Sequence, residues 1–259
     1  MRADNGIRRV FSKAAADYDK NAFIQQRICR EFIDSQFFKG ASFGMALDVG
    51  TGTAGMINEI SRNFPGSRII GLDFALGMLK EAKTNGVKLL VQADGQHFPF
   101  TGSAFDLIVS NLAYQWIVDL DGAFSEAMRI LKPNGLFCIS LFGKTTLWQL
   151  RECISKVKNT AFIKTLPSEE EIRNKLERAG FGAIDTAASV ENEQFYDIFE
   201  LLRWLKILGV NKAGLKFSAL EARGLLKLAG KLYMEKFKTG DKISASFEKI
   251  FVRAVKPDR

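Results

Sequence analysis

The sequence has little histidine and cysteine, and it lacks any long apolar run. His97 is the only histidine, so a Ser-His-Asp triad is disfavoured, and a metal site built from several histidines is excluded. Cys29, Cys138 and Cys153 show no metal-ligand spacing, so we expect reduced thiols in a cytoplasmic protein without a metal. No run reaches the roughly 18–20 apolar residues of a transmembrane helix, and the N-terminus has no apolar signal-peptide core.

Positive charge is in excess, and two segments hold it. The net charge is +8, while apolar residues form 47% of the chain, which is enough for a full core. Residues 1–30 carry seven Lys/Arg against three Asp, and residues 195–242 carry ten against five acidic residues. This distribution suits either solvated helix faces or a docking surface for an acidic macromolecule.

Residues 44–142 alternate short apolar runs with longer amphipathic stretches. Because nearly all-apolar strands are typical of sheets covered on both faces, we predict an α/β fold with a mostly parallel, seven-stranded sheet and helices on both sides. The first five expected strands are 45–49, 67–72, 87–92, 105–110 and 136–142. The helices expected between them are 54–64, 75–84 and 120–131.

The segments on either side of this block are expected to complete a single domain, 1–259. Before it, residues 8–37 have a loosely amphipathic pattern, so 1–40 is expected to form a helical cap. After it, Ser168 and Glu171 form a capping box that begins a helix. The elements expected after the block are helices at 145–158 and 168–179, strands at 183–190 and 244–254, and a helical lid inserted at 195–242.

A glycine-rich turn follows the first expected strand. Residues 47–55 are Leu-Asp-Val-Gly-Thr-Gly-Thr-Ala-Gly, and the glycines let the backbone turn sharply and approach a ligand closely. The spacing Gly-x-Gly-x-x-Gly also fits dinucleotide-binding proteins, so the turn alone does not decide the ligand.

Three aspartates stand at the ends of successive expected strands: Asp48, Asp73 and Asp94. Open α/β sheets bind ligands at this carboxyl edge. Asp48 suits a ligand with a positive amino group and would repel a pyrophosphate, whereas Asp73 can accept hydrogen bonds from two ribose hydroxyls. Asp94 can accept from an adenine amino group. A dinucleotide would account for Asp73 but for neither of the other two.

Residues 45–142 as a whole resemble the class I S-adenosylmethionine-dependent methyltransferases, whose fold is Rossmann-like. The resemblance implies S-adenosyl-L-methionine as cofactor, S-adenosyl-L-homocysteine as product, and no metal. The residues implied for cofactor binding are Asp48, Gly50, Thr51 and Gly52 for the methionine part, Asp73 for ribose and Asp94 for adenine. Many members carry Cys where this chain has Thr51.

The fourth expected strand ends in Ser-Asn-Leu-Ala-Tyr-Gln-Trp, residues 110–116. We expect Asn111 to lie beside the cofactor and line the methyl-transfer cavity, and Trp116 to wall it. Methyl transfer needs mainly alignment, because the sulfonium is already an activated donor. A phenol or amine acceptor usually needs a general base, whereas a carboxylate is anionic at neutral pH. We interpret His97 as structural, so the sequence is compatible with a carboxylate acceptor.

Several phrases resemble the malonyl-acyl-carrier-protein O-methyltransferases of biotin synthesis. The more specific are Phe-Ser-x-Ala-Ala-x-x-Tyr at 11–18 and Thr-Leu-Trp-x-Leu-Arg at 146–151. The phrase at 110–116 and Leu-Leu-Arg-Trp-Leu-Lys-Ile-Leu-Gly at 201–209 are also similar, while 212–240 match only loosely. This family esterifies the free carboxylate of a malonyl group on acyl carrier protein, which starts pimeloyl synthesis.

The narrower resemblance implies catalytic and docking residues. Arg151 is the candidate cation for the malonyl carboxylate, since a guanidinium binds a carboxylate bidentately. Tyr18 could close over the site and donate a hydrogen bond to the substrate. Carrier proteins are acidic, so the segments 1–30 and 195–242 are candidate docking faces for malonyl-acyl carrier protein, with no nucleic-acid or membrane partner expected. The docking candidates are Arg8, Arg9, Arg203, Lys206 and Arg223.

Other functions stay open at this level. A methyltransferase for another small acid or a quinone precursor would share the cofactor half and differ in the lid. A protein-arginine hydroxylase resembling respiratory complex I assembly factors shares the Ser-Asn-Leu-x-x-x-Trp and Thr-Leu-x-x-Leu-Arg phrases. A non-catalytic binding module is disfavoured, because the glycines and the three aspartates are intact.

Overall fold

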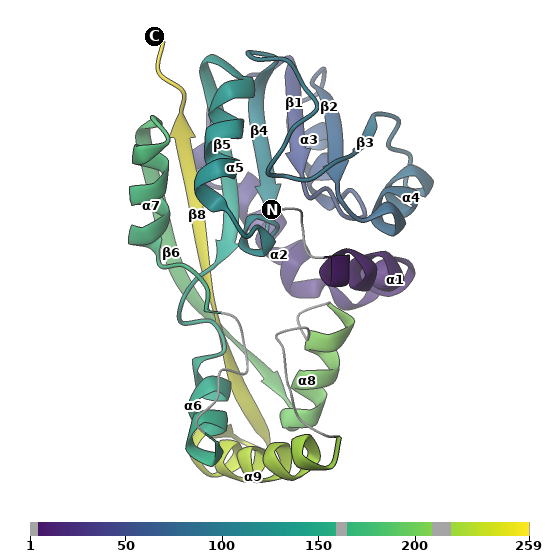
Figure 1. Cartoon of the computed structure of the whole chain (residues 1–259), viewed down its shortest axis with the longest axis vertical. Helices are drawn as coiled ribbons and strands as arrows, with labels where there is room; N and C mark the ends of the chain where they lie inside the picture. Colours follow the sequence, from purple (N-terminus) through teal and green to yellow (C-terminus); the bar gives the residue numbers. More distant parts are fainter. Residues whose placement is uncertain (1–4, 159–164, 209–218, 259) are drawn as a thin grey trace. The chain divides into compact units, whose positions relative to one another are not determined.

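The computed structural model describes residues 5–158, 165–208 and 219–258 of the chain (Figure 1). The chain divides into two compact units. The first comprises residues 1–141, 167–188 and 250–259, and the second comprises residues 142–166 and 189–249. Over the described ranges, no helix is both long enough and apolar enough to cross a membrane.

One sheet contains all the strands. These are β1 Met45–Val49, β2 Arg68–Asp73, β3 Leu90–Gln92, β4 Phe105–Asn111, β5 Leu131–Phe142, β6 Gly182–Phe195, β7 Lys238–Thr239 and β8 Lys242–Val255. Their order is β3-β2-β1-β4-β5-β8-β6, and the two-residue β7 pairs with β8. The pairs among β1 to β5 are parallel, which confirms the predicted α/β fold. The strand order reverses between β1 and β4, where open α/β sheets bind ligands.

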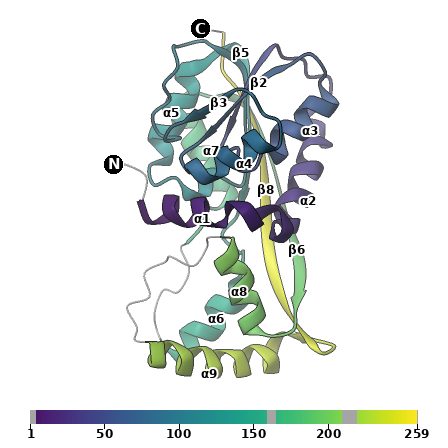
Figure 2. The same ribbon diagram turned by 90° about the vertical axis from the view of Figure 1, so that its right-hand side faces the viewer.

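Helices cover both faces of the sheet in the first unit. These are α1 Asn5–Asn21, α2 Phe23–Ile33, α3 Gly55–Asn63, α4 Leu76–Thr84, α5 Leu120–Ile130 and α7 Glu169–Arg178, with short 3-10 turns η1 Gln36–Phe38 and η2 Tyr114–Trp116. α2 packs with α3 on one face, and α5 packs with α7 on the other (Figure 2). Apolar residues recur every three or four positions in α5, so Phe124, Ala127 and Ile130 are all fully buried in the core.

The N-terminal segment forms two helices where one was expected. α1 ends at Asn21, whose Nδ2 donates to the carbonyl of Asp17 at 2.8 Å, and α2 begins at Phe23. The amide of Ala22 still donates to the carbonyl of Tyr18 at 2.9 Å, so the chain bends without leaving this amide unpaired. No proline or glycine marks the bend, and the apolar pattern alone did not predict it.

The second unit contains helices in the segment 195–242, where a helical insertion was expected. The helices of this unit are α6 Trp148–Val157, α8 Ile198–Ile207 and α9 Ala219–Phe237. α9 packs against α6 and α8, and a Cβ added to Gly230 of α9 would lie 2.7 Å from Cγ2 of Ile198. Tyr233 is fully buried, and its hydroxyl donates to the carbonyl of Ser244 at 3.0 Å. This unit therefore has its own packed interior.

Candidate functional site

The glycine turn after β1 wraps around the end of β2. The amides of Gly50 and Thr51 both donate to the carbonyl of Leu72, at 2.7 and 2.9 Å. Gly50 has φ +74°, and a Cβ there would lie 2.2 Å from the Cβ of Ala113 in the loop after β4. Glycine alone satisfies both conditions, so this residue lets the loops after β1 and β4 approach each other.

Asp73 ends β2 and is held by backbone amides. Its carboxylate accepts from the amide of Gly52 at 2.9 Å and from that of Ala75 at 2.8 Å. Burial raises the pKa of Asp73 to about 6, although the hydrogen bonds from Ala75 and Gly52 oppose the rise. The carboxylate fixes the glycine turn against β2 and has further lone pairs for a ligand hydroxyl.

Asp48 lies beneath the glycine turn, and it lines neither of the two cavities described below. It is fully buried, and its Oδ2 accepts from Oγ1 of Thr51 at 2.7 Å. Its Oδ1 has no hydrogen-bond partner among the described residues. Burial raises the pKa of Asp48 to about 7, with a smaller opposing effect from the Thr51 hydrogen bond. The structure thus makes Asp48 a support for the turn, with one acceptor oxygen left over.

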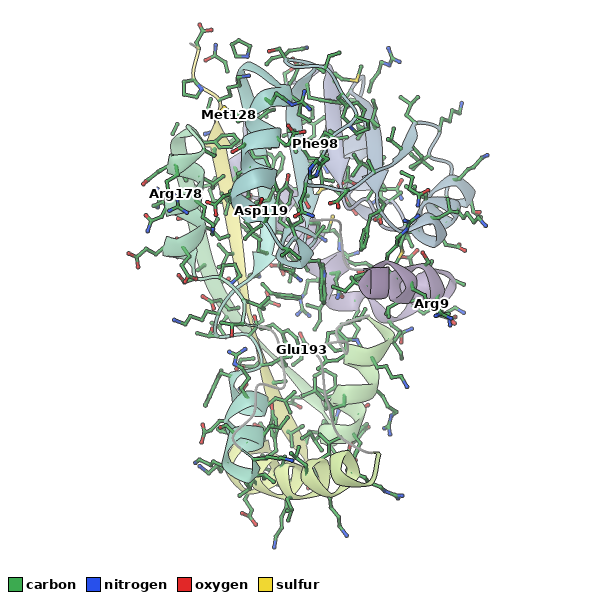
Figure 3. The ribbon with its side chains drawn as sticks, viewed as in Figure 1. Arg9, Phe98, Asp119, Met128, Arg178 and Glu193 are labelled. Carbon is green, nitrogen blue, oxygen red and sulfur yellow. The ribbon has the colours of Figure 1, made fainter. Side chains whose placement is uncertain are left out.

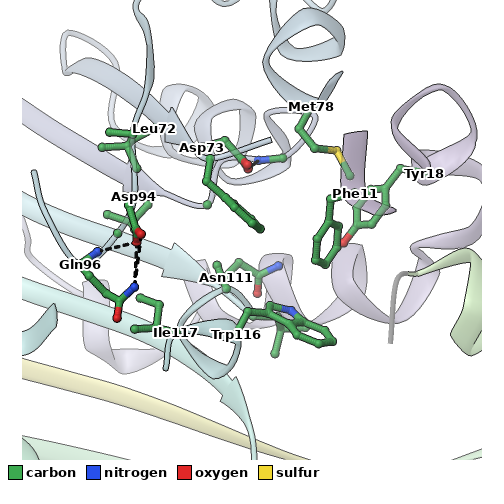
Figure 4. A pocket seen from close by; sticks show the side chains of 18 residues that line it. Phe11, Tyr18, Leu72, Asp73, Met78, Asp94, Gln96, Asn111, Trp116 and Ile117 are labelled. Atoms are coloured by element: carbon green, nitrogen blue, oxygen red, sulfur yellow. Dashed lines mark hydrogen bonds between the residues drawn. The ribbon is translucent and has the colours of Figure 1, made fainter. Parts of the chain in front are cut away.

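Asp94 follows β3 and lies in the first cavity beside Gln96 (Figure 4). Its Oδ1 accepts from the backbone amide of Gln96 at 3.0 Å and from the side-chain Nε2 at 3.1 Å. Gln96 is buried, and its Oε1 accepts from the amide of Asp119 at 3.2 Å. Gln96 was not singled out from the sequence. Its place two residues after Asp94 was the available signal.

Gly50, Gly52, Asp73, Asp94 and Gln96 line a cavity of about 100 Å³ at the carboxyl edge of the sheet. Aromatic side chains form one wall, in which Phe11 of α1 contacts Trp116 and Phe74 edge-on, with ring centroids 5.5 and 6.2 Å apart (Figure 4). Other lining residues are Tyr18, Met78, Asn111 and Ile117. α1 therefore completes a cavity that the strand ends begin.

A second and more polar cavity of about 260 Å³ adjoins the first. The residues that line both are Tyr18, Gly50, Gly52 and Asn111. Asn111 is fixed at this junction, because its Nδ2 donates to the carbonyl of Gln25 at 3.0 Å and its Oδ1 accepts from Oγ of Ser140 at 2.7 Å. The two cavities thus form adjoining parts of one cleft that passes the glycine turn.

Two contacts place Tyr18 at this junction. A Cβ on Gly77 of α4 would lie 2.2 Å from the carbonyl oxygen of Ser12, so α1 packs directly on α4. Asp19 accepts from Oγ1 of Thr53 at 2.5 Å, which ties α1 to the glycine turn. Burial raises the pKa of the Tyr18 phenol, and the charges of Asp73 and Asp19 raise it further. Tyr18 therefore stays protonated at neutral pH and is available as a hydrogen-bond donor.

Arg151 belongs to the second unit, where the loop 143–147 is fastened to β8. The amide of Leu147 donates to the carbonyl of Ser246 at 2.6 Å, and that of Thr145 donates to Oε2 of Glu248 at 2.7 Å. One Arg151 nitrogen donates to the carbonyl of Thr146 at 2.7 Å, and the other terminal nitrogen donates to the carbonyl of Lys144. These carbonyls orient the guanidinium, which has further N–H donors for an anion.

His97 is exposed and lines neither cavity. Cys29, Cys138 and Cys153 are free and buried, and burial raises the pKa of each thiol. Within the described part of the chain, no group of three or more His, Cys, Asp or Glu is placed to hold a metal ion. The first cavity thus offers carboxylates, amides, a phenol and aromatic rings, while Cys29, Arg30 and Arg62 are among the residues that line the second.

Known proteins similar to this chain were found by sequence. A family model described as a methyltransferase domain matches residues 47–139. The malonyl-[acyl-carrier protein] O-methyltransferase of Geobacter sulfurreducens is 31% identical over 95% of this chain and 96% of its own length. The protein of the same name from Methylovorus sp. is 32% identical over 97% of this chain and 88% of its length. The chain belongs to this malonyl-[acyl-carrier protein] O-methyltransferase family.

Membership makes the chain an S-adenosylmethionine-dependent methyltransferase. A solved structure supports the fold: phosphoethanolamine N-methyltransferase 2 of Haemonchus contortus, in complex with phosphomonomethylethanolamine and S-adenosylhomocysteine, has a TM-score of 0.56. It is 23% identical and covers 95% of this chain and 57% of that chain, so the likeness concerns the fold alone.

The cleft of this methyltransferase fits S-adenosylmethionine chemically. Asp73 and Asp94 offer acceptor oxygens within the first cavity, and the wall of Phe11 and Trp116 presents aromatic rings suited to a cation such as a sulfonium. Gly50 leaves the backbone of the turn free to approach a ligand. Asp48 lines neither cavity and contributes by holding Thr51 of that turn.

Proposed function

We propose that this methyltransferase transfers a methyl group from S-adenosylmethionine to the free carboxylate of malonyl-acyl carrier protein, which begins pimeloyl synthesis for biotin. One observation carries the choice of acceptor. Among the described residues, the lining of the first cavity contains no His, Cys, Lys or Arg, and its phenol, Tyr18, is held protonated. The carboxylates in this lining, Asp73 and Asp94, are assigned to the cofactor below, so the cavity suits an acceptor that is already nucleophilic, as a carboxylate is at neutral pH.

The residues at the strand ends are assigned to the cofactor. We infer that Asp73 accepts from the ribose hydroxyls and Asp94 from the adenine amino group. Gly50, Thr51 and Gly52 lie along the methionine part, with Asp48 supporting them through Thr51. When bound, the cofactor supplies a methyl group already activated by its sulfonium, so the chain's own residues need chiefly to align the two reactants.

Three residues are assigned to the acceptor. Asn111, fixed between Gln25 and Ser140, borders the transfer path at the junction of the two cavities. The protonated phenol of Tyr18 donates a hydrogen bond to the acceptor. Arg151 binds the malonyl carboxylate with those guanidinium N–H groups that do not already donate to the carbonyls of Thr146 and Lys144.

The partner assignment rests on surface charge. Arg8 and Arg9 are exposed on α1, and Figure 3 shows Arg9 on its outer side. Arg203, Lys206 and Arg223 are exposed in the second unit. We assign these basic side chains to an acidic carrier protein. The buried, free cysteines agree with a cytoplasmic location.

Incubation with methyl-labelled S-adenosylmethionine and malonyl-acyl carrier protein is expected to give a carrier-bound methyl ester that mild base releases as labelled methanol. Acetyl-acyl carrier protein is the matched control and should stay unlabelled, because it has no free carboxylate. Label on a quinone precursor with none on the malonyl substrate would contradict the proposal. Hydroxylation of arginine in a protein substrate would contradict it as well.

Arg151→Ala is expected to lower kcat/KM for the malonyl substrate by about 100-fold or more, since a carboxylate loses a charged partner worth about 3 kcal/mol. S-adenosylhomocysteine affinity, measured by calorimetry, should change less than about threefold. Arg173→Ala is the matched control, because Arg173 also donates to a backbone carbonyl, that of Ile184 at 2.8 Å, but belongs to α7. An equal loss of cofactor affinity and malonyl use in Arg151→Ala would show that the division of roles is wrong.

A further inference from the structure

α8 has two faces of opposite character. Half of its ten residues are buried, namely Ile198, Leu201, Leu202, Trp204 and Leu205. Trp204 contacts Phe195 and Phe247, each with ring centroids 5.6 Å apart. Asp197 caps the helix by accepting from the amide of Glu200 at 2.7 Å. One face of α8 is thus anchored in the second unit.

The other face combines exposed apolar and basic side chains. Phe199 and Ile207 are each 38% exposed, and Arg203 and Lys206 are exposed between them. Residues three or four positions apart share one side of a helix, so these four form a single surface, here named the α8 face. Tyr196, just before the helix, is 64% exposed and extends the apolar part.

Among the described residues, the two cations of the α8 face have no partner. Neither the Arg203 nor the Lys206 side chain forms an ion pair or hydrogen bond with another residue in the described ranges. Elsewhere in the same unit, Lys236 and Lys156 pair with Glu152 at 3.0 and 2.9 Å. The α8 face therefore presents positive charge that an external carboxylate can still neutralise.

We propose that the α8 face is the docking surface for the acidic protein that carries the malonyl group, an inference that rests on the proposed function. Carboxylates of the partner pair with Arg203 and Lys206, while Phe199 and Ile207 cover its apolar side chains. Charge of this kind speeds encounter, and one helix face is small enough for the partner to leave after each transfer.

The test is a charge reversal at two positions, Arg203→Glu with Lys206→Glu. The matched control is Lys80→Glu with Lys83→Glu on α4, which are also exposed, have the same spacing, lie outside the two basic segments and give the same change in net charge. The α8 variant should lose at least about tenfold in affinity for unacylated carrier protein, by calorimetry, and in kcat/KM for malonyl-acyl carrier protein. S-adenosylhomocysteine affinity and the thermal midpoint should match wild type in both variants.

Two results would overturn the inference: wild-type carrier affinity in the α8 variant, or the same loss in the α4 control. A single-stranded oligonucleotide that binds the wild type and not the α8 variant, with no carrier binding, would assign the face to nucleic acid instead. Carrier binding that depends on the α8 face, without methyl-ester formation by wild type, would refute the proposed function and uphold the docking surface. Absence of both binding and transfer would refute both.

Discussion

Gly50→Ala is expected to reduce the affinity for S-adenosylhomocysteine by at least about 100-fold in calorimetry. The φ of +74° at this position costs an alanine about 1–2 kcal/mol. The new methyl group would lie 2.2 Å from the Cβ of Ala113, so the loops after β1 and β4 must move apart, which costs about 1–3 kcal/mol more. The same movement displaces the turn that we assign to the methionine part.

Gly55→Ala is the control for this prediction, because it adds the same methyl group five residues further along the same turn without strain. Gly55 begins α3, its φ is not positive, and no atom lies within 4 Å of the added Cβ. Cofactor affinity should stay within about threefold of wild type. If both variants lost affinity equally, a methyl group anywhere on the turn would obstruct the ligand, and the contact with Ala113 would not be the cause.

The core strands could be predicted because each is a nearly continuous apolar run between turn residues. The start of β5 could not: it begins at Leu131, before the polar residues 132–135, where an expected turn was placed. The amide of Asn134 donates to the carbonyl of Lys256 at 2.9 Å, and that of Lys256 donates to the carbonyl of Gly135 at 3.0 Å. Leu131 pairs with Phe105 and Leu136 pairs with Leu107, so the stretch between them forms a bulge, with Asn134 at φ +61°. Pairing with a distant segment keeps this bulge within β5, and no local pattern reports it.

The cofactor side of the site was partly predictable. Parallel strands bring their carboxyl ends to one edge, so Asp73 and Asp94 could be placed together from strand order alone. Phe11 could not be placed there, because α1 reaches the cavity through its packing on α4 and its tie to Thr53, which no local pattern predicts. The inward position of Asp48 also escaped prediction, since a residue at a strand end can face the ligand or the core.

The surroundings of Arg151 show why the acceptor side is harder to predict. The phrase at 146–151 is recognisable, but its loop is held by Ser246 and Glu248, about a hundred positions further along the chain. The sequence marks the guanidinium as a candidate. It does not reveal that carbonyls of Lys144 and Thr146 orient it.

Asp48→Asn is expected to make the unliganded protein more stable than wild type, and increasingly so as pH rises. The pKa of Asp48 is about 7 in the folded protein, above its ordinary value of 3.8, because burial disfavours the charge. A raised pKa stabilises the fold at low pH, and this contribution is lost as pH rises from about 4 to about 7. Asparagine does not ionise, so the Asp48→Asn variant does not lose this stability as pH rises.

Urea denaturation at pH 5 and pH 8 measures the effect. The stability advantage of Asp48→Asn over wild type should grow by about 2–3 kcal/mol between these pH values, at about 1.4 kcal/mol per pKa unit. Asp106→Asn is the control of opposite sign. Burial acts to raise the pKa of Asp106. Hydrogen bonds from the side chain of Lys132 and the amide of Met45 outweigh burial and hold this pKa below its usual value. Its carboxylate therefore stabilises the fold above pH 4, and Asp106→Asn should lower stability at both pH values.

Saturating S-adenosylhomocysteine should reverse the order of stability at pH 8. A ligand stabilises the fold in proportion to the logarithm of its concentration over its dissociation constant, so the tighter binder gains more. Ionised Asp48 holds the glycine turn by accepting from Oγ1 of Thr51 at 2.7 Å, and asparagine would place a donor amide or a weaker acceptor there. A variant that stayed more stable than wild type with the ligand present would show that the buried charge does not serve cofactor binding.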